Sequence, residues 1–378
     1  MQPSKISVIM PTYNHAAFVT AAVESVLSQQ GVDFELLIAD DGSADGTRDV
    51  VAAIRDQRIR FFPNSVNRGA CVVINELISR ACGEYIALIN SDDYWLGSDK
   101  LACQLDLLRA NPAVGACFGR ARFVDKDGAT IGKATLPNSY GYVFEQDNRS
   151  QGNWLRHFFD LGNCLCHPTI LIRKSCYAEL GGYDNRLRQL PDFAMWIRLV
   201  KRFPILVCDR ELIAFRQLPG ENASSDTGTN LRRIVNEFFF ILREFFDGMP
   251  RAVLQEGFGD LLVDRELPDE RHVDIEKALL YLGGERWAAH VYRLVAMEKL
   301  FALLASPEHR PLLVQRYGFD DRAFHALTAE VEAFDMENSP CPLSSVKGAA
   351  LLAEVKRRVV LRLPPALRPT MNKVLALR

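Results

Sequence analysis

Two adjacent carboxylates, Asp92 and Asp93, directly follow the apolar residues 85–89 in this chain. A segment that is apolar throughout, rather than alternating, is typical of a parallel strand buried on both faces. Ligands of open α/β sheets bind just beyond the carboxyl ends of such strands. Neighbouring carboxylates also repel each other unless a cation offsets their charge. The stretch therefore predicts a divalent-metal site that holds an anionic ligand, with a solvated turn and helix-capping carboxylates as the alternative.

The elements that position this pair form a regular series. Short apolar segments at residues 6–10, 34–39, 59–62 and 85–89 predict strands, and helices are expected between them. Asn14 is the expected N-cap of the first helix, at about residues 16–30. The order βαβαβαβ with short connections predicts a parallel sheet with right-handed crossovers. No Gly-x-Gly-x-x-Gly or Walker-type loop is present, which argues against a dinucleotide cofactor or an ATP-type P-loop.

The pattern changes after Asp93. Helices are expected at residues 99–110, 174–180 and 192–203, and separate short strands at 114–118, 121–124, 167–173, 205–208 and 212–216. Residues 219–229 have the composition of a linker, and the chain beyond them is helical in pattern. We therefore expect an α/β domain over residues 1–225 and a helical region over residues 226–378. The basic residues between 356 and 368 fit a solvated helix face or attachment to a membrane surface.

Composition excludes several classes of protein. The chain of 378 residues is 48% hydrophobic and 24% charged, as in ordinary globular proteins. Its net charge of -2 argues against a protein that coats nucleic acid, because such a protein needs an excess of positive charge. Nine scattered cysteines suit a reducing compartment. Cys164, Cys166 and His167 lie close in sequence, but without a suitably spaced fourth ligand they are expected in the core. We see neither a signal peptide nor an apolar run of 18 residues.

Four predicted strand ends supply polar residues to one edge of the sheet. Tyr13 and Asp40 can offer a stacking surface and a hydrogen-bond acceptor to a nucleotide base and its ribose. Arg68, together with a metal ion on the Asp pair, can compensate the charge of a diphosphate. Each of these residues alone has a simple structural explanation, but their placement at successive strand ends favours a nucleotide-diphosphate site.

These loops resemble the motifs of the family 2 glycosyltransferases, which are inverting enzymes with the GT-A fold. The resemblance covers about residues 5–218. It rests on four segments in the right order and spacing: VIMPTYN at residues 8–14, LIADDGSADGT at 37–47, NRG at 67–69 and ALINSDD at 87–93. It implies a Rossmann-like, mostly parallel central sheet flanked by helices.

The resemblance also implies roles for the donor side. Asp40 is expected to read the uracil or another pyrimidine of a nucleotide sugar, and Arg68 to lie beside the nucleotide. Asp92 and Asp93 match the family's Asp-x-Asp-type motif, which contacts the ribose and a Mg²⁺ or Mn²⁺ ion, with Asp93 favoured as the more direct metal ligand. The same site is expected to be lined by Pro11, Thr12 and Tyr13.

On the acceptor side the match is to a helix that carries the general base. Asp192 takes the position of that base, while Pro191 replaces the glutamate that usually precedes it. Asp192 also suits an N-cap, and the two roles are compatible. Gly182 and Asp184 match an acceptor-side loop, and Arg216 matches a basic position that can meet the diphosphate. Leu218 stands where this motif often has a histidine.

The predicted function is an inverting hexosyltransferase-type glycosyltransferase. It would move a sugar from a nucleotide diphosphate donor, expected to be a UDP-sugar, to a hydroxyl of a glycan or lipid-linked acceptor. Family context suggests biosynthesis of surface polysaccharide, lipopolysaccharide or another glycoconjugate, in the cytoplasm or peripherally at the inner face of the membrane. The alternatives are a nucleotidyltransferase and a sugar-nucleotide-binding scaffold without catalysis.

Overall fold

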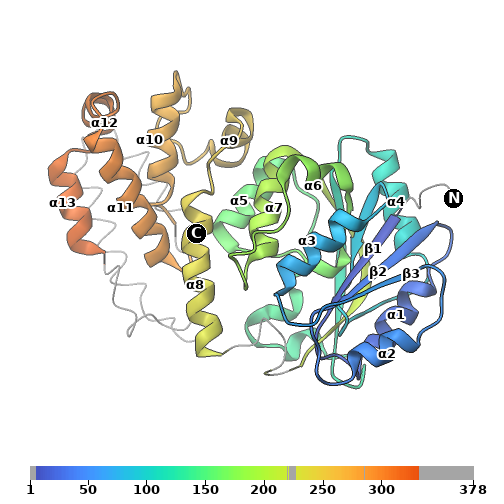
Figure 1. Ribbon diagram of the computed structural model, residues 1–378. Helices are drawn as coiled ribbons and strands as arrows, with labels where there is room; N and C mark the ends of the chain where they lie inside the picture. Colours follow the sequence, from blue (N-terminus) through green and yellow to red (C-terminus); the bar gives the residue numbers. More distant parts are fainter. Residues whose placement is uncertain (1–5, 219, 221–226, 285, 332–378) are drawn as a thin grey trace. The chain divides into compact units, whose positions relative to one another are not determined.

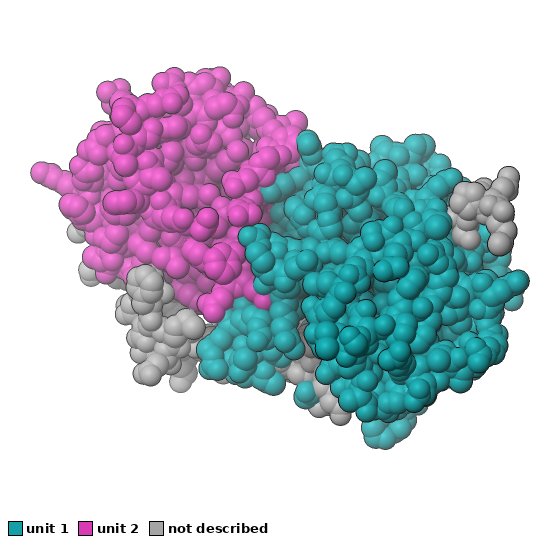
Figure 2. Space-filling model, in the orientation of Figure 1, with its two compact units in different colours: residues 1–151, 162–233 teal, residues 152–161, 234–378 magenta. Residues whose placement is uncertain are grey.

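The computed structural model describes residues 6–218, 220, 227–284 and 286–331. They belong to two compact units, one of residues 1–151 and 162–233 and the other of residues 152–161 and 234–378 (Figure 2). The linker expected at 219–229 lies largely outside the described residues, and the basic tail at 356–368 lies wholly outside them. The domain boundary predicted at residue 225 falls in this linker and stays a prediction.

The first unit contains an eight-stranded sheet with the order β3-β2-β1-β4-β7-β6-β8-β5. Strands β1 to β4 pair in parallel, β6 pairs in parallel with β8, and β7 and β5 run antiparallel to their neighbours. The mostly parallel sheet predicted from the sequence is therefore confirmed. The strands are β1 (Ile6–Thr12), β2 (Phe34–Asp40), β3 (Ile59–Pro63), β4 (Tyr85–Leu88), β5 (Tyr94–Trp95), β6 (Ala116–Val124), β7 (Leu171–Arg173) and β8 (Ile205–Arg216).

Helices cover both faces of this sheet (Figure 1). The chain moves outward from β1 to β3 and then returns to β4, so right-handed crossovers place α1 and α2 on one face and α3 on the other. The helices of this unit are α1 (Val19–Leu27), α2 (Thr47–Ala53), α3 (Ala70–Arg80), α4 (Lys100–Ala110), α6 (Lys174–Leu180) and α7 (Pro191–Arg202), with 3-10 turns η1 (Lys133–Thr135), η2 (Pro137–Tyr142) and η3 (His167–Thr169).

The strand order reverses between β1 and β4, which is where ligands of such sheets bind. β1 pairs with β2 on one side and with β4 on the other, and the register places Thr12 opposite Asp40. Most buried residues of these strands are apolar, as in β4, where all four residues are buried. The loops that leave β1, β2 and β4 therefore meet at one edge.

The prediction of separate short strands at 114–124 and 205–216 is wrong. Each region is one continuous strand, and β6 and β8 pair across a bulge at Gly119 and Arg120. The polar residues Asp209 and Arg210 interrupt the apolar pattern, which made β8 look like two strands. A bulge lets such residues turn outward without ending the ladder.

The second unit is built from helices around an aromatic core. Phe159 of α5 (Gln151–Leu161) is fully buried, and its ring centroid lies 5.0–5.5 Å from those of five other aromatic rings. Truncating such a residue to alanine typically costs about 3–5 kcal/mol. The other helices are α8 (Gly228–Arg243), which begins in the first unit, α9 (Arg251–Phe258), α10 (Glu270–Leu280), α11 (Ala289–Ala305), α12 (Arg310–Tyr317) and α13 (Asp321–Glu330).

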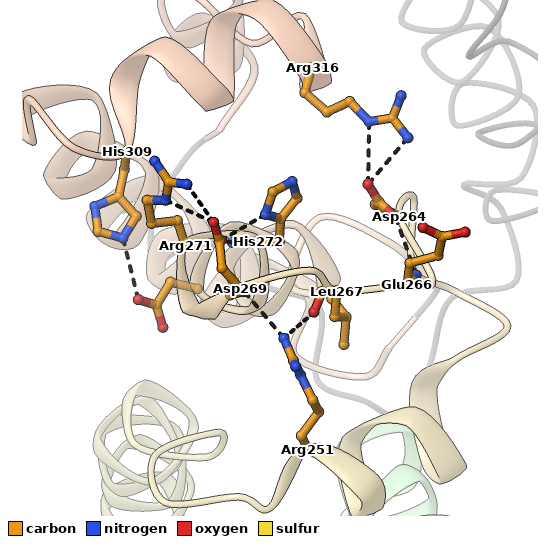
Figure 3. Close-up of polar contacts among 10 residues, drawn as sticks. Arg251, Asp264, Glu266, Leu267, Asp269, Arg271, His272, His309 and Arg316 are labelled. Atoms are coloured by element: carbon orange, nitrogen blue, oxygen red, sulfur yellow. Dashed lines mark hydrogen bonds and ion pairs between the residues drawn. The ribbon is translucent and has the colours of Figure 1, made fainter.

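Polar side chains hold the loop before α10 (Figure 3). Asp269 caps this helix by accepting a hydrogen bond from the backbone N–H of His272, and it also pairs with Arg271. Leu267 adopts a φ of 47°, which is unfavourable for leucine. Arg251 donates to the Leu267 carbonyl and the Leu267 side chain is fully buried, so the surrounding structure holds this conformation.

No helix among the described residues combines the length and the apolar character needed to cross a bilayer.

His167 is a partly buried histidine that should make stability depend on pH. Its Nε2 lies 2.9 Å from the Tyr183 hydroxyl, and burial lowers the pKa of His167 from 6.5 to about 4. Between these values the unfolded chain binds a proton that the folded chain does not, so stability is complete above pH 6.5 and falls toward pH 4. At about 1.36 kcal/mol per pH unit this window is worth about 3 kcal/mol.

We therefore expect the unfolding free energy of the wild type to fall more steeply between pH 6.5 and 4 than that of His167→Gln. Urea denaturation at several pH values measures both curves. Parallel curves would show that His167 does not contribute this pH dependence.

Candidate functional site

The ends of β1 and β2 form the first part of the site. Thr12 and Asp40 are paired in the sheet and almost fully buried, while the ring of Tyr13 is 45% exposed. The Asp40 carboxylate accepts hydrogen bonds from the backbone N–H of Ser43, at 3.2 Å, and from the Ser43 hydroxyl. The Thr12 hydroxyl is buried and has no hydrogen-bond partner among the described residues. A buried acceptor thus lies beside an exposed aromatic ring, as recognition of a base requires.

Asn14 joins the loop after β1 to the loop after β2. Its side-chain oxygen accepts from the Ala44 N–H at 3.0 Å, and its own N–H donates to Ser43 Oγ at 2.8 Å. Its φ of 54° lies in the left-handed region, which asparagine tolerates better than most residues. The prediction that Asn14 caps a helix starting near residue 16 is wrong, because α1 begins at Val19 and the Asn14 side chain is used between the loops.

Sequence reasoning missed His15 in this network. His15 Nδ1 lies 2.7 Å from Ser91 Oγ, which connects the loop after β1 to the residue before the Asp pair. His15 lies in a loop that the sequence had already singled out, so its position was the available signal. Asp45 accepts from the N–H groups of Ala16 and Thr47, just where α2 begins at Thr47.

The Asp pair lies at the end of β4, and Asp93 is nearly fully buried. Asp93 Oδ1 accepts the backbone N–H of Arg216 at 2.8 Å, and Oδ2 accepts from Asn90 Nδ2 at 3.1 Å. Burial first, and then the charge of Asp92, raise the pKa of the Asp93 carboxyl well above its usual range. Two adjacent carboxylates are therefore held close together at the end of β4, and the charge of Arg216 offsets part of their repulsion.

Arg216 supports this loop. Its Nε donates to the Asp92 carbonyl at 2.8 Å, and Nη1 donates to the carbonyls of Asp125 and Lys126. The buried guanidinium also lies over the rings of Phe18 and Tyr94. Arg216 was predicted on the acceptor side, and the structure places it against the Asp pair, where it positions the loop.

The donor groups of the Asp pair suit Mg²⁺ or Mn²⁺, because both ions prefer oxygen ligands. Within the described residues, no group of three or more His, Cys, Asp and Glu side chains could hold a metal by itself. Mg²⁺ commonly binds to one or two carboxylates together with phosphate oxygens of the substrate. A metal ion bound jointly by this pair and a diphosphate therefore fits the residues present.

Arg68 and Asp41 define the loop after β3. Asp41 is buried, and its two oxygens accept the backbone N–H groups of Arg68 and Gly69, each at 2.9 Å. The Arg68 guanidinium pairs with Glu76 of α3. The loop is thus fixed next to Asp40. The Arg68 side chain forms its ion pair with a residue of the helix that follows this loop.

Asp192 occupies the second position of α7, after Pro191, which suits the first position because it lacks an N–H. Asp192 Oδ1 accepts the Phe193 N–H, and Oδ2 accepts from Asn163 Nδ2, both at 2.8 Å. These two hydrogen bonds hold the carboxylate in one orientation at the N-terminus of α7. Asp192 is also only partly buried, so it has the exposure that a general base needs.

The loop with Gly182 and Asp184 is attached to α3. Asn75 accepts the Tyr183 N–H and donates to the Tyr183 carbonyl, both at 2.8 Å. A Cβ on Gly182 would clash with the Asn75 side chain, so glycine is required there for close approach. Asp184 pairs with the exposed Arg186.

The buried Cys166 lies near two of the carboxylates predicted for the site. Burial first, and then the carboxylates of Asp93 and Asp192, raise the pKa of the Cys166 thiol well above its usual range. Both carboxylates therefore lie within electrostatic range of the same sulfur. Cys164 and Cys166 are both buried, in keeping with their expected place in the core.

Comparison with known proteins identifies the family. Residues 7–175 match the model of glycosyl transferase family 2. The chain is 30% identical over 242 residues to the Bacillus subtilis protein TuaG, which is named as a glycosyltransferase of teichuronic acid biosynthesis, and the match covers 63% of this chain and 87% of that protein. It is 33% identical over 137 residues to Escherichia coli WfgD, named UDP-Glc:alpha-D-GlcNAc-diphosphoundecaprenol beta-1,3-glucosyltransferase, covering 36% of this chain and 53% of that protein.

The fold has solved counterparts. A crystal structure of Staphylococcus aureus TarS residues 1–349 in complex with UDP-GlcNAc superimposes with a TM-score of 0.54 at 18% identity, over 86% of this chain and 90% of that one. This likeness shows the fold, and the predicted GT-A architecture is confirmed. Family membership favours a glycosyltransferase over the nucleotidyltransferase and the scaffold that the sequence left open. The chain belongs to glycosyltransferase family 2 and is a glycosyltransferase of the GT-A fold.

Proposed function

We propose that this glycosyltransferase moves a sugar, with inversion, from a UDP-sugar to a hydroxyl group of a glycan or lipid-linked acceptor. The observation that carries the proposal is the buried pair Asp92 and Asp93, which follows β4 at the edge of the sheet where Thr12 and Asp40 also lie. Asp192, at the start of α7, is a partly exposed carboxylate that can act as a base.

Different residues of the proposed donor site contact different parts of the nucleotide. Asp40 reads the uracil, Tyr13 stacks on it, and Pro11 and Thr12 line the same site. The support for this arrangement is that Asp40 is buried beside an exposed aromatic ring. Arg68 is the cationic side chain beside the nucleotide, and reaching the ligand requires it to leave Glu76.

Asp192 is the general base. It takes the proton of the acceptor hydroxyl as the oxygen attacks the anomeric carbon, and the bond to the diphosphate breaks on the opposite side. A single in-line displacement of this kind inverts the configuration of the sugar. The bonds from Asn163 and Phe193 orient the carboxylate for this step.

Asp93 and Asp92 would hold a Mg²⁺ or Mn²⁺ ion together with the diphosphate of the donor. When bound, such an ion stabilises the negative charge of the departing nucleotide. Arg216 keeps the loop of the Asp pair in place through the Asp92 carbonyl and the Asp93 carboxylate.

The relatives suggest the biological setting. TuaG is named for teichuronic acid biosynthesis, and WfgD for a diphosphoundecaprenol-linked acceptor. We infer that this enzyme takes part in the synthesis of a cell-surface polysaccharide or another glycoconjugate. It would act in the cytoplasm, at the inner face of the membrane when its acceptor is lipid-linked.

Replacing the base should separate catalysis from donor binding. We expect Asp192→Asn to lower sugar transfer by at least about 100-fold, the usual contribution of a general base, while UDP binding is unchanged. UDP release from UDP-glucose and UDP-N-acetylglucosamine, and UDP affinity by calorimetry, measure the two properties. Transfer at the parent rate would place the base elsewhere.

Metal and nucleotide should stabilise the protein together. We expect UDP with Mn²⁺ to raise the melting temperature more than the sum of their separate effects, because the diphosphate and the Asp pair share the ion. Asp93→Asn should retain the effect of UDP alone and lose the extra stabilisation. If Mn²⁺ adds the same stabilisation to Asp93→Asn as to the parent, the Asp pair is not the metal site.

The stereochemistry of the product tests the mechanism. With an α-linked UDP-sugar, proton NMR of the first product formed should show the β anomer. An α product would require a different mechanism and a different role for Asp192.

A further inference from the structure

Two cysteines of the first unit, neither of them part of the proposed donor site, lie in contact. Cys103 belongs to α4 and Cys208 to β8, 105 positions apart in the chain, and their Sγ atoms are 4.0 Å apart. None of the cysteines in the described part of the chain forms a disulfide bond. A disulfide places its sulfurs about 2.05 Å apart, so joining this pair requires the two atoms to approach by about 2 Å.

The strand that carries Cys208 can supply part of this movement. Cys208 is paired with Gly119 of β6. The next residue of β6, Arg120, is paired with Glu211, so two residues of β8 bulge out directly after Cys208. A bulge interrupts the ladder of hydrogen bonds and leaves the extra residues unpaired. Cys208 therefore lies at an irregular point of the strand, where the ladder restrains a small shift least.

The two thiols differ in their exposure. Cys103 is partly exposed, whereas Cys208 is only 8% exposed and packs in the core. Burial first, and then the neighbouring Cys103, raise the pKa of Cys208 to about 11, so the Cys208 thiol keeps its proton at neutral pH. Cys103 is therefore the thiol that a dissolved oxidant can reach, and Cys208 is placed to react with it afterwards.

An arginine lies beside the accessible sulfur. The Arg210 guanidinium interacts with the Cys103 sulfur, and two hydrogen bonds to Asp99, at 3.0 and 2.9 Å, hold this guanidinium in place. Cysteines that react with peroxides typically combine partial exposure, a nearby cation and a second cysteine within reach. Cys103 has all three of these features.

We propose that Cys103 and Cys208 form a redox modification site, at which hydrogen peroxide converts the two thiols reversibly into a disulfide. This inference depends neither on the proposed donor residues nor on the proposed base. The cysteine pattern of the chain suits a reducing compartment. In such a compartment a disulfide of this kind is transient and serves to sense oxidants rather than to stabilise the fold.

The oxidation takes place in two steps. The Cys103 sulfur gives up its proton and attacks one oxygen of the peroxide, the O–O bond breaks, and the other oxygen leaves as hydroxide, which becomes water with that proton. Cys103 is then a sulfenic acid. The Cys208 sulfur attacks the Cys103 sulfur, the S–O bond breaks, and the hydroxyl group leaves as water with the proton of Cys208. The two sulfurs thus lose two electrons and two protons, and one peroxide becomes two molecules of water.

The test maps the disulfides of the full chain after mild oxidation. The protein is treated with hydrogen peroxide, its remaining thiols are alkylated, and it is digested without reduction for mass spectrometry. Peptides joined through Cys103 and Cys208 should be the main linked species, and dithiothreitol should separate them. Cys103→Ser should abolish this link, whereas Cys208→Ser should leave Cys103 as a sulfenic acid that dimedone labels.

The matched control is Cys82→Ser. Cys82 is exposed and, like Cys103, lies beside an arginine, with its sulfur 3.8 Å from Arg60 Nη1. This variant removes an accessible thiol without touching the pair, so it should form the link between Cys103 and Cys208 as fast as the parent chain.

Three results with the parent chain would overturn the inference, and none of them depends on the folding of a variant. In the first, Cys103 and Cys208 are still alkylated at peroxide concentrations that oxidise Cys82. In the second, Cys208 is linked mainly to Cys117, a buried thiol near the pair. In the third, Cys103 is oxidised to a sulfinic acid without forming a link.

Discussion

Burial of two adjacent carboxylates at the end of β4 is the constraint on which the site depends. Burial and mutual repulsion raise the pKa of Asp93, so the ionised pair needs positive charge nearby. Hydrogen bonds from the Arg216 N–H and from Asn90 orient Asp93, and the charge of Arg216 favours its ionised form. A divalent metal ion at this pair would add further positive charge.

The sheet brings those loops together. Because β1 pairs in register with both β2 and β4, the polar residues at their carboxyl ends meet at the point where the strand order reverses. Hydrogen bonds from Asn14 and His15 then join the three loops to each other. The donor side is therefore rigid before any ligand binds, which reduces the cost of ordering it on binding.

Local pattern was enough to predict the donor side. The strands are apolar and end in polar residues, so Thr12, Asp40 and Asp93 could be placed at one edge from the sequence alone. Residues that act over long sequence distances could not be placed in this way. The bond from Asn163 to Asp192 joins residues 29 positions apart in the chain, and no local pattern signals it. The role of Arg216 was also missed, because its interactions are with backbone groups of distant loops.

A crystal structure of the enzyme with UDP and Mn²⁺ tests the central claim most directly. The account predicts the uracil against Asp40 and Tyr13, Mn²⁺ between the diphosphate and the Asp92 and Asp93 carboxylates, and Asp192 facing the space where the sugar is attached. A nucleotide bound elsewhere, or a metal ion bound without either carboxylate, would contradict it.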